Sequence, residues 1–72
     1  MKAGDLVVYQ SPGGEIEYGF VRAVVVNVDG QEFPNRQIGC TIFEVVWYLD
    51  GESSREDDSS LKSGQIRVIS EN

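Results

Sequence analysis

Short runs rich in valine, isoleucine and aromatic residues recur along the chain, each followed closely by glycine, proline, aspartate or serine. Apolar and polar side chains tend to alternate within the runs, which is the period of a β-strand. We therefore expect strands over residues 6–9, 18–28, 40–49, 52–57 and 65–69. The 52–57 run is polar and has low β propensity, so we expect it to be an edge strand guarded by charge.

The run 40–49 carries the strongest strand signal and the only tryptophan of the chain. Phe43, Val45 and Trp47 share one face of this strand. The opposite face includes Glu44, so we expect the apolar face to build the core. Asp50-Gly51 then predicts a two-residue type I′ turn, in which both residues have positive φ.

The run 18–28 is apolar on both faces over its second half, so we expect this strand to be well covered. Strict alternation places Tyr18, Phe20, Arg22, Val24 and Val26 on one face, and Gly19, Val21, Ala23, Val25 and Val28 on the other. Gly19 beside Phe20 predicts a bend or bulge, which a small barrel needs to turn a corner. After a turn at 27–30, residues 31–39 are expected to form a long hairpin loop, of a kind that often carries function.

Residues 58–62 predict a single helical or 3₁₀ turn. Asp58 or Ser59 is its expected cap, and Leu61 is expected to plug the end of a barrel. In the last strand, we expect Ile66 and Val68 to face inward.

Three segments carry a resemblance to a known fold: Gly4-Asp5-Leu6-Val7-Val8-Tyr9, Tyr18-Gly19-Phe20-Val21-Arg22-Ala23-Val24 and Val45-Val46-Trp47-Tyr48-Leu49-Asp50-Gly51. With a long first loop, a tight third hairpin and a one-turn helix, the pattern resembles SH3-like small barrels. Within them it looks most like Tudor domains and the Tudor-like RNA-polymerase-interacting domain of CarD-type regulators. The resemblance implies one all-β domain over residues 1–72, a five-stranded SH3-like barrel with a short 3₁₀ turn before the last strand. Leu49 departs from the Asp-Tyr-Gly ending usual in Tudor domains.

The chain has 12 acidic and 6 basic residues, a net charge of −6, and the basic residues are scattered. This balance argues against direct nucleic-acid binding, which depends on clustered Lys and Arg. With no His and one Cys, a His-based catalytic triad is impossible, so we expect no enzyme, no catalytic residue, no metal and no cofactor. No run is long enough for a membrane helix, no signal peptide opens the chain, and the lone Cys40 favours a reducing cytoplasm.

Four aromatic residues and two acids are candidates for a binding site, namely Tyr9, Tyr18, Trp47, Tyr48, Asp50 and Glu52. In Tudor domains, aromatics at the barrel mouth enclose a methylated Lys or Arg by cation–π contact, and an acid assists. The alternative is that the aromatic rings simply fill a small barrel. Tyr48, with the two acids just beyond it, is the strongest candidate for function.

These observations predict a non-enzymatic interaction module that binds a protein or peptide through an aromatic, acid-rimmed barrel mouth. Two alternatives remain open. The acidic run at 52–58 suggests a decoy or regulator, of a phage or mobile-element type, that occupies a basic nucleic-acid-binding surface. Exposed strands suggest a structural subunit that forms homo-oligomers.

Overall fold

The computed structural model describes residues 1–71, which form one antiparallel sheet and one short helix. The elements are β1 (Leu6–Gln10), β2 (Ile16–Val26), β3 (Thr41–Trp47), β4 (Ser53–Asp57), α1 (Asp58–Lys62) and β5 (Ile66–Ser70). The strand order is β4-β3-β2-β1-β5, so the last strand returns to lie beside the first. The predicted all-β class and the five strands are confirmed.

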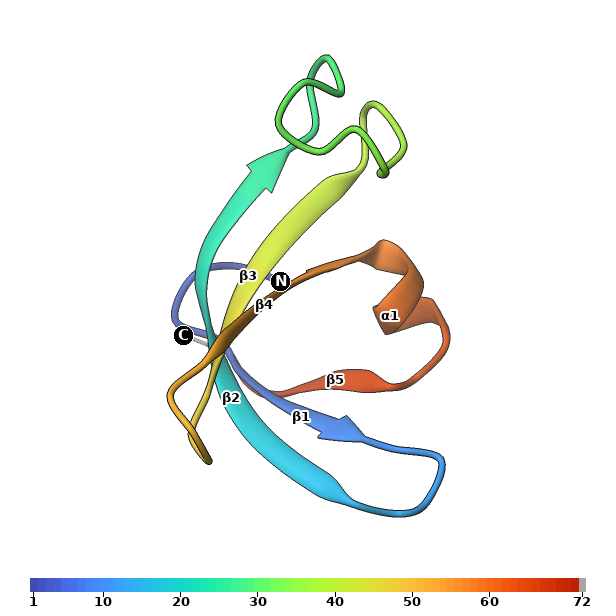
Figure 1. Ribbon diagram of the computed structural model, residues 1–72. Coiled ribbons are helices and arrows are strands. Elements are labelled where there is room, and N and C mark those ends of the chain that lie inside the picture. Colours follow the sequence, from blue (N-terminus) through green and yellow to red (C-terminus); the bar gives the residue numbers. More distant parts are fainter. Residues whose placement is uncertain (72) are drawn as a thin grey trace.

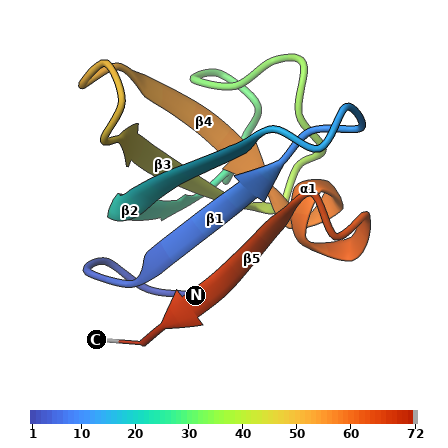
Figure 2. The ribbon, with the colours of Figure 1, turned by 90° about the horizontal axis from the view of Figure 1, so that it is seen from below.

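The sheet is strongly curved, and α1 lies between its two edge strands, β4 and β5 (Figures 1 and 2). Every neighbouring pair in the sheet is antiparallel. Within residues 1–71 no ladder joins β4 to β5, and α1 contacts both of them instead. We call the face that curves around the core the inner face and its opposite the outer face.

The core lies on the inner face and consists of Val7, Val21, Phe43, Val45, Trp47 and Ile66. The predicted core face of the central strand is therefore confirmed. Val68 and Leu61 pack against this cluster, as expected, and Leu61 does so from α1. Burial of such side chains contributes roughly 1.5–3 kcal/mol each, which makes this face the main source of stability.

A β-bulge in β2 lies at Arg22, and not at Gly19 as the sequence suggested. The register between β2 and β3 skips one residue between Val21 and Ala23, so Arg22 is the extra residue. One extra residue reverses the alternation of side chains beyond it. Beyond the bulge, Val24 and Val26 lie on the inner face, and Ala23 and Val25 on the outer face. The predicted division of this strand into two faces is wrong from that point.

The second half of β2 is exposed, contrary to the expectation that it is well covered. β1 pairs with β2 only as far as Phe20, whereas β2 continues alongside β3 to Val26. The last residues of β2 therefore extend past the end of β1, with β3 on their other side (Figure 1). The exposed fractions of Val24, Val25 and Val26 are 37%, 43% and 54%.

The first loop is short, although the sequence pattern suggested a long one. Ser11 N donates to Glu15 O over 2.9 Å, which leaves three residues at the tip. Gly14 occupies the left-handed region with φ of 87°, as a three-residue hairpin requires. This loop length fixes the register of β1 against β2.

The turn between β3 and β4, by contrast, is longer than predicted. Trp47 N donates to Glu52 O over 2.9 Å, so four residues form the turn. Only Gly51 has positive φ, at 73°, and Asp50 does not, so the type I′ prediction is wrong. The β3–β4 register differs by two residues from that of a two-residue turn, and an even shift leaves every side chain on the same face of the sheet.

The helix is capped by Asp57, rather than by Asp58 or Ser59. Asp57 has an extended backbone (φ −133°, ψ −173°) at the end of β4, and its carboxylate accepts from Ser59 N over 2.9 Å. An N-cap needs this backbone conformation, which explains why the last strand residue takes the position. Ser63 N donates to Ser59 O, an i to i+4 bond, so the turn is α-helical rather than 3₁₀.

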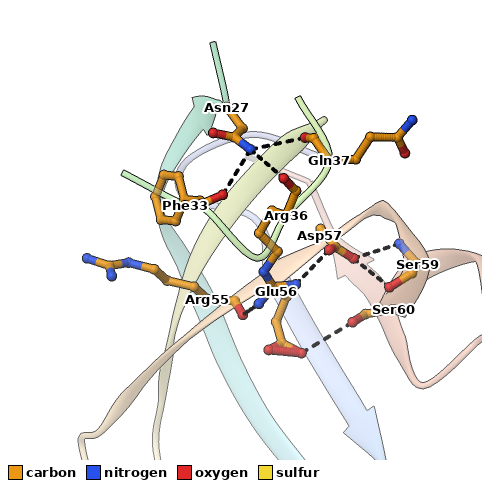
Figure 3. Close-up of polar contacts among 9 residues, drawn as sticks. All are labelled: Asn27, Phe33, Arg36, Gln37, Arg55, Glu56, Asp57, Ser59 and Ser60. Carbon is orange, nitrogen blue, oxygen red and sulfur yellow. Dashed lines mark hydrogen bonds and ion pairs between the residues drawn. The ribbon is translucent and has the colours of Figure 1, made fainter. Parts of the chain in front are cut away.

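The predicted long loop is present, and it folds back against β4 (Figure 3). Arg36 donates to the Asp57 carboxylate over 2.6 Å and to the Arg55 carbonyl oxygen over 2.9 Å. The Arg55 guanidinium lies 5.3 Å from the centre of the Phe33 ring. Phe33 and Ile42 are buried but lie outside the main core cluster, so the loop covers a second, smaller apolar site.

Asp57 gives this part of the fold a dependence on pH. Hydrogen bonds from Ser59, and then from Arg36, lower the pKa of the Asp57 carboxyl below its ordinary value of 3.8. A lowered folded-state pKa means that the carboxylate stabilises the fold above the ordinary value. That contribution is lost as the pH falls through the lowered pKa.

Asp57→Asn is expected to lower the free energy of unfolding by about 1 kcal/mol near neutral pH, because asparagine still caps the helix but loses the charge facing Arg36. The difference from wild type should shrink below pH 3.8. Urea denaturation at several pH values measures it. Asp58→Asn, at the next and exposed position, is the control and should change stability by less than about 0.5 kcal/mol. A gap for Asp57→Asn that stays constant with pH would contradict the assignment.

Candidate functional site

A hollow of about 240 Å³ opens on the inner face and is lined by Tyr9, Glu17, Trp47, Ser54 and Glu56. We call it the Tyr9–Trp47 hollow. Its lining comes from β1, β2, β3 and β4, so residues from four strands meet there. Water occupies about 30 Å³ per molecule in the liquid, so an ammonium or guanidinium group has room to enter.

Two aromatic rings form the apolar wall of the Tyr9–Trp47 hollow. Their centroids are 6.1 Å apart and their planes meet at 69°, an edge-to-face arrangement. Trp47 Nε1 donates to the Ser54 hydroxyl over 2.9 Å, which fixes the orientation of the indole. Trp47 is 9% exposed, and Tyr9 is half-buried. Both rings are therefore held in place before any ligand arrives.

Two carboxylates face the same hollow. Glu17 lies directly opposite Tyr9 in the β1–β2 pair, and Glu56 lies opposite Phe43 in the β3–β4 pair. The Ser60 hydroxyl donates to Glu56 over 3.3 Å. In the part of the chain that the structure describes, neither glutamate takes part in an ion pair. The hollow thus combines aromatic rings with uncompensated negative charge.

The six residues predicted from the sequence do not form a single site. Tyr9 and Trp47 meet in the hollow. Tyr18 and Tyr48 lie on the outer face, where the Tyr48 ring is 5.7 Å from that of Phe20. The exposed fractions of Tyr18 and Tyr48 are 54% and 61%.

The two predicted acids lie at the turn between β3 and β4. Asp50 accepts a hydrogen bond from Glu52 N over 3.0 Å, and both residues are exposed. Neither lines the Tyr9–Trp47 hollow. The acids beside the aromatic rings are Glu17 and Glu56, and not Asp50 and Glu52 as the sequence suggested.

Sequence reasoning missed these two glutamates, although the chain contained a signal for one of them. A three-residue hairpin loop at residues 12–14 pairs Ser11 with Glu15 and, counting outward, Tyr9 with Glu17. Reading the glycine-rich turn as a short hairpin would therefore have placed Glu17 beside Tyr9.

The acidic run at 52–58 does not form one continuous acidic surface. Glu56 faces the inner hollow, whereas Asp57 is paired with Arg36 and caps the helix. Glu52 and Asp58 are exposed. Across residues 1–71, no three His, Cys, Asp or Glu side chains are grouped so that they could hold a metal ion.

Within residues 1–71, no helix is both long enough and apolar enough to cross a membrane. Comparison with protein families, with curated proteins and with solved structures finds no match to this chain. The function must therefore be argued from the chemistry of the site.

Proposed function

We propose that the chain is a non-enzymatic interaction module that binds a basic side chain of a protein or peptide partner in the Tyr9–Trp47 hollow. The proposal keeps the aromatic, acid-rimmed mouth expected from the sequence and from its resemblance to Tudor domains. It replaces the outer-face tyrosines and the turn acids by Glu17 and Glu56. The partner group is a lysine, a methylated lysine or an arginine.

The observation that carries the proposal is the pairing of two fixed aromatic rings with two glutamates that have no cationic partner within the described residues. A cation over an aromatic face gains about 0.5–2 kcal/mol, and more as the site loses water. Carboxylates beside the rings add charge attraction and select a cation over a neutral group. If the two rings only filled the core, that role would not explain why two glutamates line the same hollow.

Titration with single-residue probes tests the proposal. The probes are the acetyl amides of lysine, trimethyllysine and norleucine, the last being a neutral analogue of similar length. We expect the two cationic probes to shift the Trp47 indole N–H resonance, with half-saturation at roughly 1–10 mM. Norleucine amide should leave the resonance in place.

Paired variants identify the acids responsible. Glu17→Gln with Glu56→Gln should weaken lysine amide binding about tenfold, a loss of about 1.4 kcal/mol. Asp50→Asn with Glu52→Gln removes the same amount of charge outside the hollow and should leave binding almost unchanged. Equal binding of norleucine and lysine amides, or equal losses in the two double variants, would overturn the proposal.

A further inference from the structure

One edge of β2 is open beyond the point where β1 ends. The ladder between β1 and β2 stops at the pair Leu6–Phe20, and Val21 bonds to the backbone of Gly4 and Asp5. Beyond this point, among residues 1–71, β2 pairs with β3 on one side and with no strand on the other. In Figure 1 this part of β2 lies on the side of β3 that faces away from β4.

The backbone groups that point to the open edge can be assigned from the hydrogen bonds beyond the end of β2. Asn27 N donates to Cys40 O, and Gly39 N donates to Asn27 O, so the groups of Asn27 point toward the β3 side. Backbone direction alternates along a strand, and the groups of Val25 therefore point the same way. Those of Val24 and Val26 point outward, and each offers one donor and one acceptor.

The side chains on this edge include no lysine, no proline and no acidic group, which are among the devices that keep an edge strand from pairing. Residues 23–26 are Ala-Val-Val-Val, and the segment 18–28 contains no acidic residue in a chain of net charge −6. The nearby Arg22 is ion-paired with Glu44. Another copy can therefore approach this edge without the charge repulsion expected over the rest of the surface.

We propose that β2 of one copy pairs antiparallel with β2 of a second copy through residues 24–26. A two-fold axis at Val25 places Val24 of the first copy opposite Val26 of the second, and Val26 of the first opposite Val24 of the second. The pairing makes four backbone hydrogen bonds, because both residues of each such pair direct their donor and acceptor outward. It also brings four exposed valine side chains together on the inner face.

The register is self-complementary, which is why a second copy is the occupant. A two-fold interface uses the same patch on both subunits, so each donor meets the acceptor it needs. An acidic partner protein would meet exposed valines and no free cation on residues 23–26. The contact is short, and we expect an association in the range of weak interfaces, with Kd of roughly 0.1–1 mM.

Analytical ultracentrifugation of the full chain at increasing concentration tests the proposal. The wild type should show a reversible monomer–dimer equilibrium. Val26→Lys should weaken it at least about tenfold, because it places a charge in the row of valines. Ile16→Lys is the matched control, since Ile16 is 52% exposed at the other end of the same strand. This control should dimerise like the wild type.

Hydrogen exchange of the wild type provides a readout that needs no variant. The amides of Val24 and Val26 should gain protection as the concentration rises, whereas that of Val25, which is already directed to β3, should not change. A wild type that stays monomeric to about 1 mM overturns the proposal. So does equal association of Val26→Lys and wild type, or equal loss in both lysine variants. Binding of a foreign extended peptide to this edge by a monomeric wild type would assign the edge to another partner.

Discussion

Replacing Gly19 by alanine is expected to lower the free energy of unfolding by about 2–3 kcal/mol. A Cβ atom at this position would lie 2.7 Å from the backbone oxygen of Val46, 2.8 Å from the Trp47 ring and 2.9 Å from a Val45 methyl. The backbone oxygen belongs to the β2–β3 ladder and cannot move without breaking it. A domain of this size has roughly 4–10 kcal/mol of stability, so the loss is a large share.

Urea denaturation followed by Trp47 fluorescence measures this effect. Gly13→Ala is the matched control, because a Cβ there would meet only the Ser11 hydroxyl, at 3.8 Å. Gly13 does not have positive φ, so alanine is tolerated there. We expect Gly13→Ala to raise the free energy of unfolding by about a few tenths of a kcal/mol. If Gly19→Ala and Gly13→Ala proved equally stable, the close approach of β2 and β3 described above would be incorrect.

The sequence was most informative where local pattern and tertiary packing agree. In β3, alternation placed Phe43, Val45 and Trp47 on the core face, and they are there. Glu44 was enough to identify the solvated side, because charged residues are rarely buried without a partner. The strands and the helical turn were also found within a few residues of their observed bounds.

Errors arose where a single residue changes the geometry without leaving a pattern. The bulge at Arg22 is invisible to alternation, yet it exchanges the faces of every later residue in β2. Gly19 suggested a bulge for a sound reason, but its role is to leave room for Trp47 and the Val46 backbone. The exposure of Val24, Val25 and Val26 depends on where β1 ends, which the run of valines does not encode.

The sequence predicted only part of the candidate site, because the strand registers that bring its residues together leave no pattern in the sequence. Tyr9 and Trp47 were two of the four aromatic candidates, and their rings are in contact, an arrangement that depends on two hairpin registers. Tyr18 and Tyr48 were grouped with them because aromatic content alone does not separate two faces of a sheet. Gly19 supplies that separation, since its missing side chain faces the core and its neighbours in β2 must face away.

Asn27→Ala is expected to release the long loop and lower the free energy of unfolding by about 2–3 kcal/mol. The Asn27 side-chain amide is buried and donates to the carbonyl oxygens of Phe33, Arg36 and Gln37 at 3.2, 3.0 and 3.1 Å (Figure 3). Its own oxygen accepts from Gly30 N over 3.2 Å. Alanine would remove all four of these bonds. Phe33 O and Gln37 O would keep the bonds that they accept from Arg36 N and Cys40 N, whereas Arg36 O and Gly30 N would lose the side-chain partner that Asn27 gives them. Leaving such groups unsatisfied is costly.

The loss should be local as well as global, because the main core on the inner face does not include Asn27. Amide exchange in residues 28–39 should speed up well before exchange in β1 and β3 does. Asn35→Ala removes an exposed amide from the same loop and should change stability by less than about 0.5 kcal/mol. If the two alanine variants exchanged alike, Asn27 would not be the anchor, and Arg36 with Asp57 would have to hold the loop alone. Faster exchange confined to residues 28–39 would instead show that this one buried amide sets the conformation of the loop over β4.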